Sequence, residues 1–169
     1  MPVFLPGLGA YVRWQALGVS QETRAAVSLA GPLAGWLGAA VCGLLWWKTG
    51  NNLWAGLAHF TALLNVLNLI PVWILDGGQA IPALSKAERI VLLTSCVLLL
   101  IFLRAPVFLL VAGGAAYRLF DKGMSIAPSR VTTAYFVALL TAWGLVLLLV
   151  PNANRRKALE ALLVPQFCI

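Results

Sequence analysis

Acidic residues, histidine and cysteine are all scarce in this chain. Its 169 residues include five Asp and Glu, one His and three Cys, against twelve Lys and Arg. The cysteines, Cys42, Cys96 and Cys168, show neither zinc-finger nor redox spacing, so we interpret them as small apolar side chains. Their spacing excludes a zinc finger and a dithiol redox centre, and the shortage of acids makes each carboxylate a candidate for a specific role.

Charge of either sign is sparse as well. Only 10% of the residues are charged, 62% are hydrophobic, and the mean hydropathy is +0.92. The net charge of +7 would suit a nucleic-acid-binding protein, but Lys and Arg stand at the ends of apolar runs and form no single basic stripe. That placement is typical of topology signals in membrane proteins. We therefore expect a lipid bilayer around the chain and no nucleic-acid partner.

Four long apolar regions predict the architecture. They cover residues 28–47, 53–75, 90–120 and 131–150, and a bilayer-spanning helix needs about 20 apolar residues. The third region is interrupted by Arg104 and Pro106, and because proline opposes an uninterrupted helix, it forms either two short segments or one kinked span. The sequence predicts an all-α multi-pass membrane protein with four or five transmembrane helices.

This assignment divides the chain into three parts. Residues 1–27 form an N-terminal hairpin or loop segment, residues 28–150 form the transmembrane core, and residues 151–169 form a basic C-terminal tail. The tail carries the cluster Arg155, Arg156 and Lys157, which we expect near lipid phosphates.

The basic residues also predict an orientation. Four of them share one face of the membrane, opposite Lys48, and an excess of Lys and Arg marks the cytoplasmic side; they are Arg13, Arg24, Lys86 and Arg89. Three further residues join them only if residues 90–120 form a hairpin, namely Arg118, Lys122 and Arg130. The C-terminal cluster joins them only if that region is a single span. In either case Asp76 emerges towards the cytoplasmic face.

Asp76 stands at the edge of the second apolar region, in the stretch Asn68–Gly78. An ionised carboxylate near hydrocarbon is costly unless it is paired, hydrated or bound to a metal. Pro71 disfavours helix at Ile70, so we expect the backbone to loosen from about Asn68 and Gly77-Gly78 to turn the chain after Asp76. A binding site and a plain helix end with an interfacial acid are equally compatible with these residues.

Small residues mark one face of the first apolar region. Gly31, Gly35 and Ala39 are four apart, so they share a helix face along which another membrane helix can approach closely. Pro32 fits the first turn of a helix, where its missing N–H is not needed. Taken alone, this pattern indicates ordinary helix packing.

The two motifs together resemble the site-2 protease family, the M50 intramembrane zinc metallopeptidases. Ala30-Gly31-Pro32 is followed, after the next apolar region, by Asn68-x-x-Pro71-x-x-x-Leu75-Asp76-Gly77. The resemblance extends from about Val3 to Arg118, and the segment Val3 to Trp14 resembles the family's β-hairpin. It implies a multi-pass endopeptidase of the bacterial plasma membrane that cuts transmembrane peptide substrates.

Carried over residue by residue, the resemblance makes Asp76 the third protein ligand of a zinc ion. Asn68 matches an asparagine that contacts the substrate backbone or the oxyanion, and Asn65 and Pro71 are expected beside it on the substrate side. The family's two histidines and its glutamate base come from an HExxH motif, which this chain does not contain. We therefore expect zinc binding by this chain alone to be weak or absent.

The single histidine does not replace the missing ligands. If the chain runs as a helix and then as an extended strand from His59 to Asp76, their side chains are roughly 25 to 40 Å apart unless the chain folds back. Two functions from different classes remain: an endopeptidase whose metal motif lies outside the given sequence, and a non-catalytic membrane scaffold that keeps the protease fold to bind helices.

Overall fold

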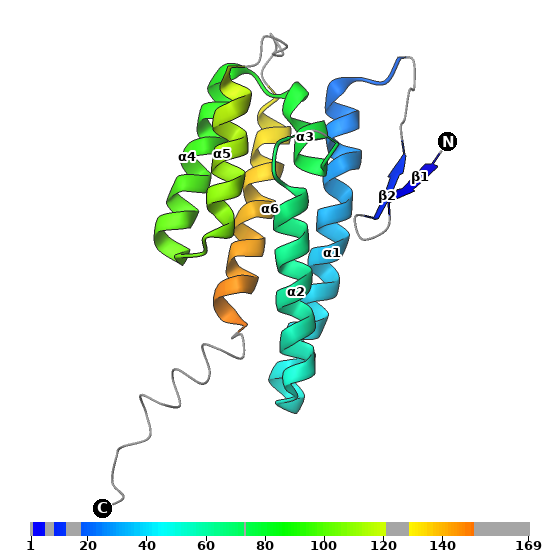
Figure 1. Ribbon diagram of the computed structural model, residues 1–169, viewed down its shortest axis with the longest axis vertical. Helices are drawn as coiled ribbons and strands as arrows, with labels where there is room; N and C mark the ends of the chain where they lie inside the picture. Colours follow the sequence, from blue (N-terminus) through cyan, green and yellow to red (C-terminus); the bar gives the residue numbers. More distant parts are fainter. Residues whose placement is uncertain (1, 6–8, 13–17, 73, 121–128, 151–169) are drawn as a thin grey trace, which may run out of the picture.

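The apolar regions of the chain fold into helices that pack side by side in the computed structural model (Figure 1). The structure describes residues 2–5, 9–12, 18–72, 74–120 and 129–150, and of the first two ranges only the backbone. Several residues of the sequence predictions lie outside the described residues; these are Arg13, Lys122, Cys168 and the tail 151–169 with its basic cluster.

The first long helix, α1, covers Gln21–Thr49. Ser20 begins it, since its side chain accepts a hydrogen bond from the Thr23 N–H at 3.1 Å, and Gly50 ends it in the left-handed conformation with φ 66°. The helix therefore starts before the predicted residue 28. The prediction that Pro32 occupies a first turn is wrong, because the buried ring lies inside α1, where packing against other helices offsets the missing hydrogen bond.

The second helix, α2, covers Asn52–Asn68 and is capped by Asn51, whose side chain accepts from the Leu53 N–H at 2.9 Å. The predicted loosening of the backbone at Asn68 is confirmed, so the rest of the apolar region that reaches residue 75 lies beyond the helix. Beyond the break, the short helix α3 covers Asp76–Ala80 and the 3₁₀ turn η1 covers Ile81–Ala83.

The third apolar region forms two helices, α4 at Lys86–Leu103 and α5 at Val107–Leu119, which pack along each other (Figure 1). Arg104 stands in the turn between them with φ 49°, a left-handed conformation that non-glycine residues adopt rarely. Of the two predicted alternatives, the structure therefore contains the hairpin. The last helix, α6, covers Arg130–Leu149 and contacts α1, α2 and α4.

Ahead of α1, the backbone forms a short antiparallel pair. Strand β1 covers Pro2–Leu5 and strand β2 covers Gly9–Val12, with Pro2 opposite Val12.

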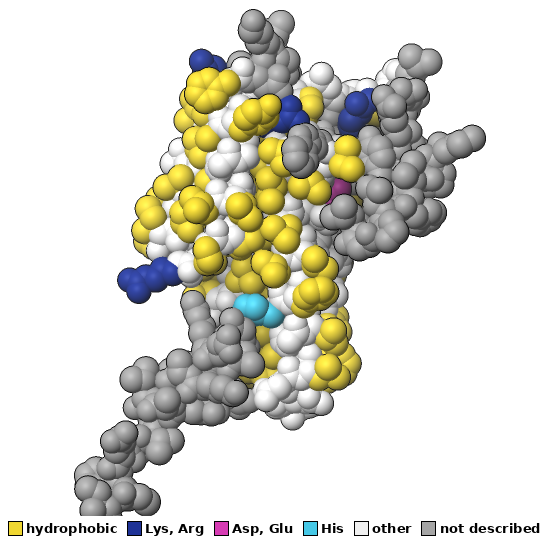
Figure 2. All heavy atoms as spheres, in the orientation of Figure 1, with side chains coloured by type: hydrophobic (Ala, Val, Ile, Leu, Met, Phe, Trp, Pro, Cys, Tyr) yellow, Lys and Arg dark blue, Asp and Glu magenta, His cyan; other side chains and the backbone are white. Residues whose placement is uncertain are grey.

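The core lies where the helices meet, and its largest wholly buried side chains are aromatic and aliphatic; they include Trp143, Phe108, Phe136, Leu29 and Leu69. Cys96 is also wholly buried and Cys42 is half-buried. The outward faces remain apolar, as the yellow surface in Figure 2 shows, and Trp47, Phe60 and Phe102 expose 60% or more of their area. A surface of that kind suits contact with lipid or with other helices.

Length and apolarity identify membrane-spanning candidates among the described helices. Two helices, α1 and α6, are long and apolar enough to cross a membrane, and α5 is a shorter apolar helix. The helical character of the chain is confirmed, and two is the number of spans that these criteria support in the described ranges.

Basic residues separate between the two ends of the bundle. One end, where α1, α4 and α6 begin and α2 and α5 finish, carries five of the described basic residues: Arg24, Lys86, Arg89, Arg118 and Arg130. The other end carries Lys48 at the end of α1 and Arg104 in the α4–α5 turn. Asp76 belongs to the more basic end, because α3 follows directly on the end of α2 (Figure 1).

Gly77 shows how closely α3 folds back on α2. A Cβ atom at this position would overlap the backbone carbonyl of Leu69, and no turn occurs at Gly77-Gly78, since both residues belong to α3. The prediction that these glycines turn the chain after Asp76 is therefore wrong. Gly77 permits a close approach of two backbone segments.

We expect Gly77→Ala to destabilise the protein, because backbone atoms must move to admit the methyl group; overpacking of this kind costs about 3 kcal/mol. Gly38→Ala is the matched control, since it also lies in a helix but meets nothing within 4 Å, and alanine is favoured in helices by about 0.5 to 1 kcal/mol. Thermal unfolding in detergent micelles measures both changes. Equal stability of the two variants would contradict the close approach.

Candidate functional site

Asp76 opens α3 at the point where the chain leaves the break after α2. Leu75 precedes it with extended backbone, φ −65° and ψ 157°, and α3 then packs against α1 (Figure 1). The break consists of successive tight turns, in which the Val72 N–H donates to the Ile70 carbonyl at 2.8 Å and the Leu75 N–H to the Val72 carbonyl at 3.3 Å. The segment is therefore irregular but internally hydrogen-bonded.

The small-residue face of α1 lies against two polar side chains, Asp76 of the second motif and Asn65, which precedes that motif. A Cβ atom at Gly31 would lie 3.7 Å from Asp76 Oδ2, and one at Gly35 would lie 2.6 Å from Asn65 Nδ2. The predicted packing face is confirmed, since Ala39 on the same face is 1% exposed. Gly35 thus admits the Asn65 amide to the surface of α1, and the Asp76 carboxyl lies beside Gly31 on the same face.

The Asp76 carboxyl is half-buried and accepts no hydrogen bond from any residue that the structure describes. This carboxyl lies on α3, outside the two helices that are long and apolar enough to cross a membrane. Removal from water raises the pKa of the Asp76 carboxyl from 3.8 to about 6, because burial disfavours the charged form. A nearby cation would be favoured at this position.

Asn68 and Asn65 take different positions although they share a helix face. Asn65 lies between α1 and α2, and its Nδ2 donates to the Thr61 carbonyl at 2.9 Å. Asn68 is the last residue of α2, is half-buried, and its amide makes no hydrogen bond within the described part of the chain. Asn68 is thus better placed than Asn65 to contact another polypeptide.

Pro71 is buried under α5 instead of facing outwards. A Cβ atom at Gly114 of α5 would lie 2.9 Å from Pro71 Cδ, and the Pro71 carbonyl accepts a hydrogen bond from Arg118 Nε at 3.0 Å. The structure places Pro71 behind the break, where it shapes the backbone between Asn68 and Asp76.

The described residues do not complete a zinc site. No group of three or more His, Cys, Asp and Glu side chains that could hold a metal ion lies together among them, and zinc needs at least three protein ligands at about 2 Å. Asp76 supplies one carboxylate, so the residues present do not by themselves fit the metal that the family resemblance implies.

His59 lies closer to Asp76 than an extended chain would place it. It stands in the middle of α2, ten residues before Leu69, which corresponds to about 15 Å along a helix, and Gly77 folds back onto Leu69. The predicted separation of 25 to 40 Å held for a chain that does not fold back, so it does not apply to this structure. The remaining distance still excludes a shared metal ion.

Two arginines that the sequence suggested only as topology signals contribute to this region. Arg89, at 0% exposure, and Arg118 donate hydrogen bonds to backbone carbonyls on either side of Asp76. A sequence signal for them exists: a proline break at membrane depth leaves carbonyls without partners, and cations at neighbouring helix ends can supply donors.

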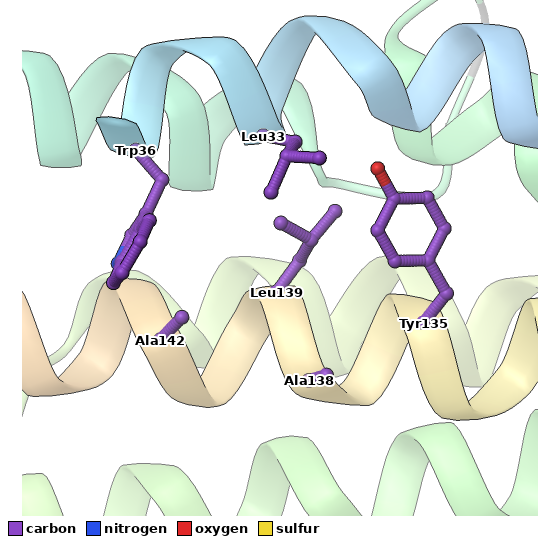
Figure 3. Close-up of a pocket in the computed structure, with 6 residues that line it drawn as sticks. All are labelled: Leu33, Trp36, Tyr135, Ala138, Leu139 and Ala142. Carbon is purple, nitrogen blue, oxygen red and sulfur yellow. The ribbon is translucent and has the colours of Figure 1, made fainter. Parts of the chain in front are cut away.

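The clearest cavities lie elsewhere, between α1 and α6. Figure 3 shows one of about 160 Å³, in which Leu33 and Trp36 of α1 face Leu139 and Tyr135 of α6. A second apolar cavity of about 400 Å³ continues along the same two helices. Neither is lined by Asp76 or Asn68, and the lining of both is almost wholly apolar.

Comparisons of the chain with protein-family models, with curated proteins and with solved structures gave no match.

We expect the 169-residue chain, purified and dialysed against buffer with micromolar zinc, to retain fewer than about one zinc per ten chains, because one carboxylate gives one of the three required ligands. Atomic absorption of the chain and of its Asp76→Ala variant measures this. Near-stoichiometric zinc that is lost in Asp76→Ala would show that the site is complete.

Proposed function

We propose that this chain is the membrane core of an intramembrane zinc metalloendopeptidase of the site-2 protease (M50) kind. In this proposal it contributes the aspartate ligand and the segment that contacts the substrate, while the histidine pair and the glutamate base come from polypeptide outside the given sequence. The observation that carries the proposal is the meeting of two motifs far apart in the sequence. Gly31 of the first motif lies against the Asp76 carboxyl of the second, and beside them Gly35 and the Asn65 amide, which lie outside both motifs, are also in contact.

The break between α2 and α3 supports the assignment of the substrate side. A membrane-embedded substrate helix has to unwind before a peptide bond becomes accessible, and an unwound peptide needs polar partners because hydrocarbon supplies none. The Asn68 amide, half-buried and without a hydrogen bond to any described residue, is such a partner. It stands at the end of α2, a few residues before Asp76, so a bound peptide would lie beside the acid.

The same proposal includes the topology. Besides the two helices that are long enough by themselves, α2, α4 and α5 lie in the same bundle, which supports four or five spans following a β-like N-terminal segment. The end with five basic residues is then cytoplasmic, and Asp76 lies near that face of a bacterial plasma membrane.

One observation favours a second function. Because the described residues hold no group of three metal ligands, the chain also suits a non-catalytic membrane scaffold that keeps the protease fold and binds transmembrane helices through its exposed apolar faces. An in-frame HExxH motif in the DNA immediately upstream of the Met1 codon would favour the protease, and a stop codon there would favour the scaffold.

The protease function predicts distinct effects of two substitutions in a version joined to an HExxH-bearing segment. Asp76→Asn should abolish cleavage of a transmembrane peptide and lower the zinc content. Asn68→Ala should slow cleavage about 10- to 100-fold, because a removed transition-state hydrogen bond costs about 1.5 to 3 kcal/mol, while the zinc content stays unchanged. Cleavage kinetics and zinc content are measured on the same preparations.

Asn51→Ala is the matched control, since it removes the same amide from the opposite end of α2, where Asn51 caps the helix. It should lower the free energy of unfolding by about 1 kcal/mol and leave cleavage unchanged. Unchanged kinetics in Asn68→Ala would refute the substrate contact, and full activity of Asp76→Asn would refute the protease assignment.

A further inference from the structure

The carbonyl of Pro71 has a partner that comes from a distant part of the chain. Arg118, in the last turn of α5, donates to it from Nε at 3.0 Å. Gly114 stands four residues earlier, one helical turn along the same face of α5. Because Gly114 has no side chain, α5 can approach the Pro71 ring, where a Cβ would lie 2.9 Å from Cδ, and this approach brings Arg118 within reach of the carbonyl.

A second arginine holds the chain on the other side of Asp76. Arg89 in the first turns of α4 is wholly buried. Its Nε donates to the Leu84 carbonyl at 3.1 Å and its Nη2 to the Ile81 carbonyl at 3.3 Å. Its Nη1 donates to the backbone carbonyl of Arg118 at 2.6 Å. The two arginines therefore form one connected set of hydrogen bonds.

The chemistry of the guanidinium group explains why arginine occupies both positions. Carbonyls at the end of α2 and around η1 lie outside regular helix, and buried carbonyls need donors. A guanidinium carries five N–H donors in a planar fork and stays charged, so one side chain can satisfy several carbonyls. Burying such a charge is costly without these bonds, which makes Arg89 an unusual choice for a mere topology signal.

We propose that Arg89 and Arg118 are positioning residues that hold the segment from Pro71 to Leu84, and with it the Asp76 carboxyl, against α1. Arg118 fixes the chain five residues before Asp76, and Arg89 fixes it five residues after. The consequence for proteolysis rests on the function proposed above, whereas the positioning itself is independent of any activity.

Hydrogen exchange tests the positioning in the full chain, reconstituted in lipid nanodiscs. Arg118→Gln should accelerate amide exchange in residues 72–79 about 10- to 100-fold, because a hydrogen bond to a charged group contributes about that factor. Exchange in α6 should change less than about twofold. Arg130→Gln, an exposed cation at the same end of the bundle, is the control and should leave residues 72–79 unchanged.

Two outcomes would overturn the proposal: unchanged exchange in residues 72–79 of Arg118→Gln, and acceleration that is equal there and in α6, which would indicate general unfolding. Arg118→Lys keeps the charge but loses the Nε donor of the fork. It should therefore accelerate exchange nearly as much as Arg118→Gln, and full protection in Arg118→Lys would mean that charge alone matters. Arg89→Gln should likewise accelerate amide exchange around Ile81 and Leu84, and the Arg118 variants test the proposal if Arg89→Gln does not fold.

Cleavage by the version joined to an HExxH segment separates failure of this inference from failure of the proposed function. If Asp76→Asn abolishes cleavage and Arg118→Gln lowers kcat with KM unchanged, both hold. If Asp76→Asn abolishes cleavage and Arg118→Gln cleaves like the unaltered protein, the positioning proposal fails by itself. If cleavage is independent of Asp76, the proposed function fails, and the exchange result still decides the positioning.

Discussion

The hydrogen bonds from arginine side chains to the backbone carbonyls on either side of Asp76 are the interaction on which the rest of the structure depends. α2 ends at Asn68, and the carbonyls that follow lie outside regular helix, so they need hydrogen-bond donors from elsewhere in the chain. The Arg118 guanidinium binds the Pro71 carbonyl, and Arg89 binds the carbonyls of Ile81 and Leu84. These hydrogen bonds allow the chain between α2 and α3 to remain outside regular helix, and they place Asp76 beside α1.

Glycines allow α1, α2 and α3 to pack closely around Asp76 and Asn65. Gly31 and Gly35 admit the Asp76 carboxyl and the Asn65 amide to the surface of α1, and Gly77 lets α3 press against the Leu69 carbonyl. At Gly35 and Gly77 a Cβ atom would collide with these neighbours, whereas at Gly31 it would stand at an ordinary van der Waals distance from the carboxyl. The polar groups are therefore enclosed by backbone and glycine, which leaves the carboxyl partly removed from water and raises its pKa.

The Asp76 carboxylate can hold a zinc ion only together with further ligands, since zinc needs at least three protein ligands. The described residues bring Asp76 and Asn68 to one end of the bundle, and no group of three metal-ligating side chains lies together among them. The arrangement is consistent with one part of a divided metal site, and equally with a fold that has kept its shape after losing chemistry. The geometry around Asp76 is the same in either case, since it is fixed by α1, α3 and the two arginines.

Local signals in the sequence predicted the helices, the end of α2 at Asn68 and the packing face of Gly31, Gly35 and Ala39, because apolar runs, proline and small residues act within a few positions of the chain. They left the hairpin of α4 and α5 undecided. They also misplaced Pro32, and they could not fix the separation of His59 from Asp76, since both depend on how the chain folds back and packs.

The sequence by itself determined where helices form, where one must break and which acid stands beside the break. Only the tertiary structure decided that Asp76 lies against Gly31, that Pro71 is covered by α5, and that Arg89 and Arg118 bind carbonyls rather than serving only as charges at helix ends. The physical reason is that a guanidinium on one helix and a freed carbonyl on another carry no mutual signal along the chain. Their pairing arises when the helices pack.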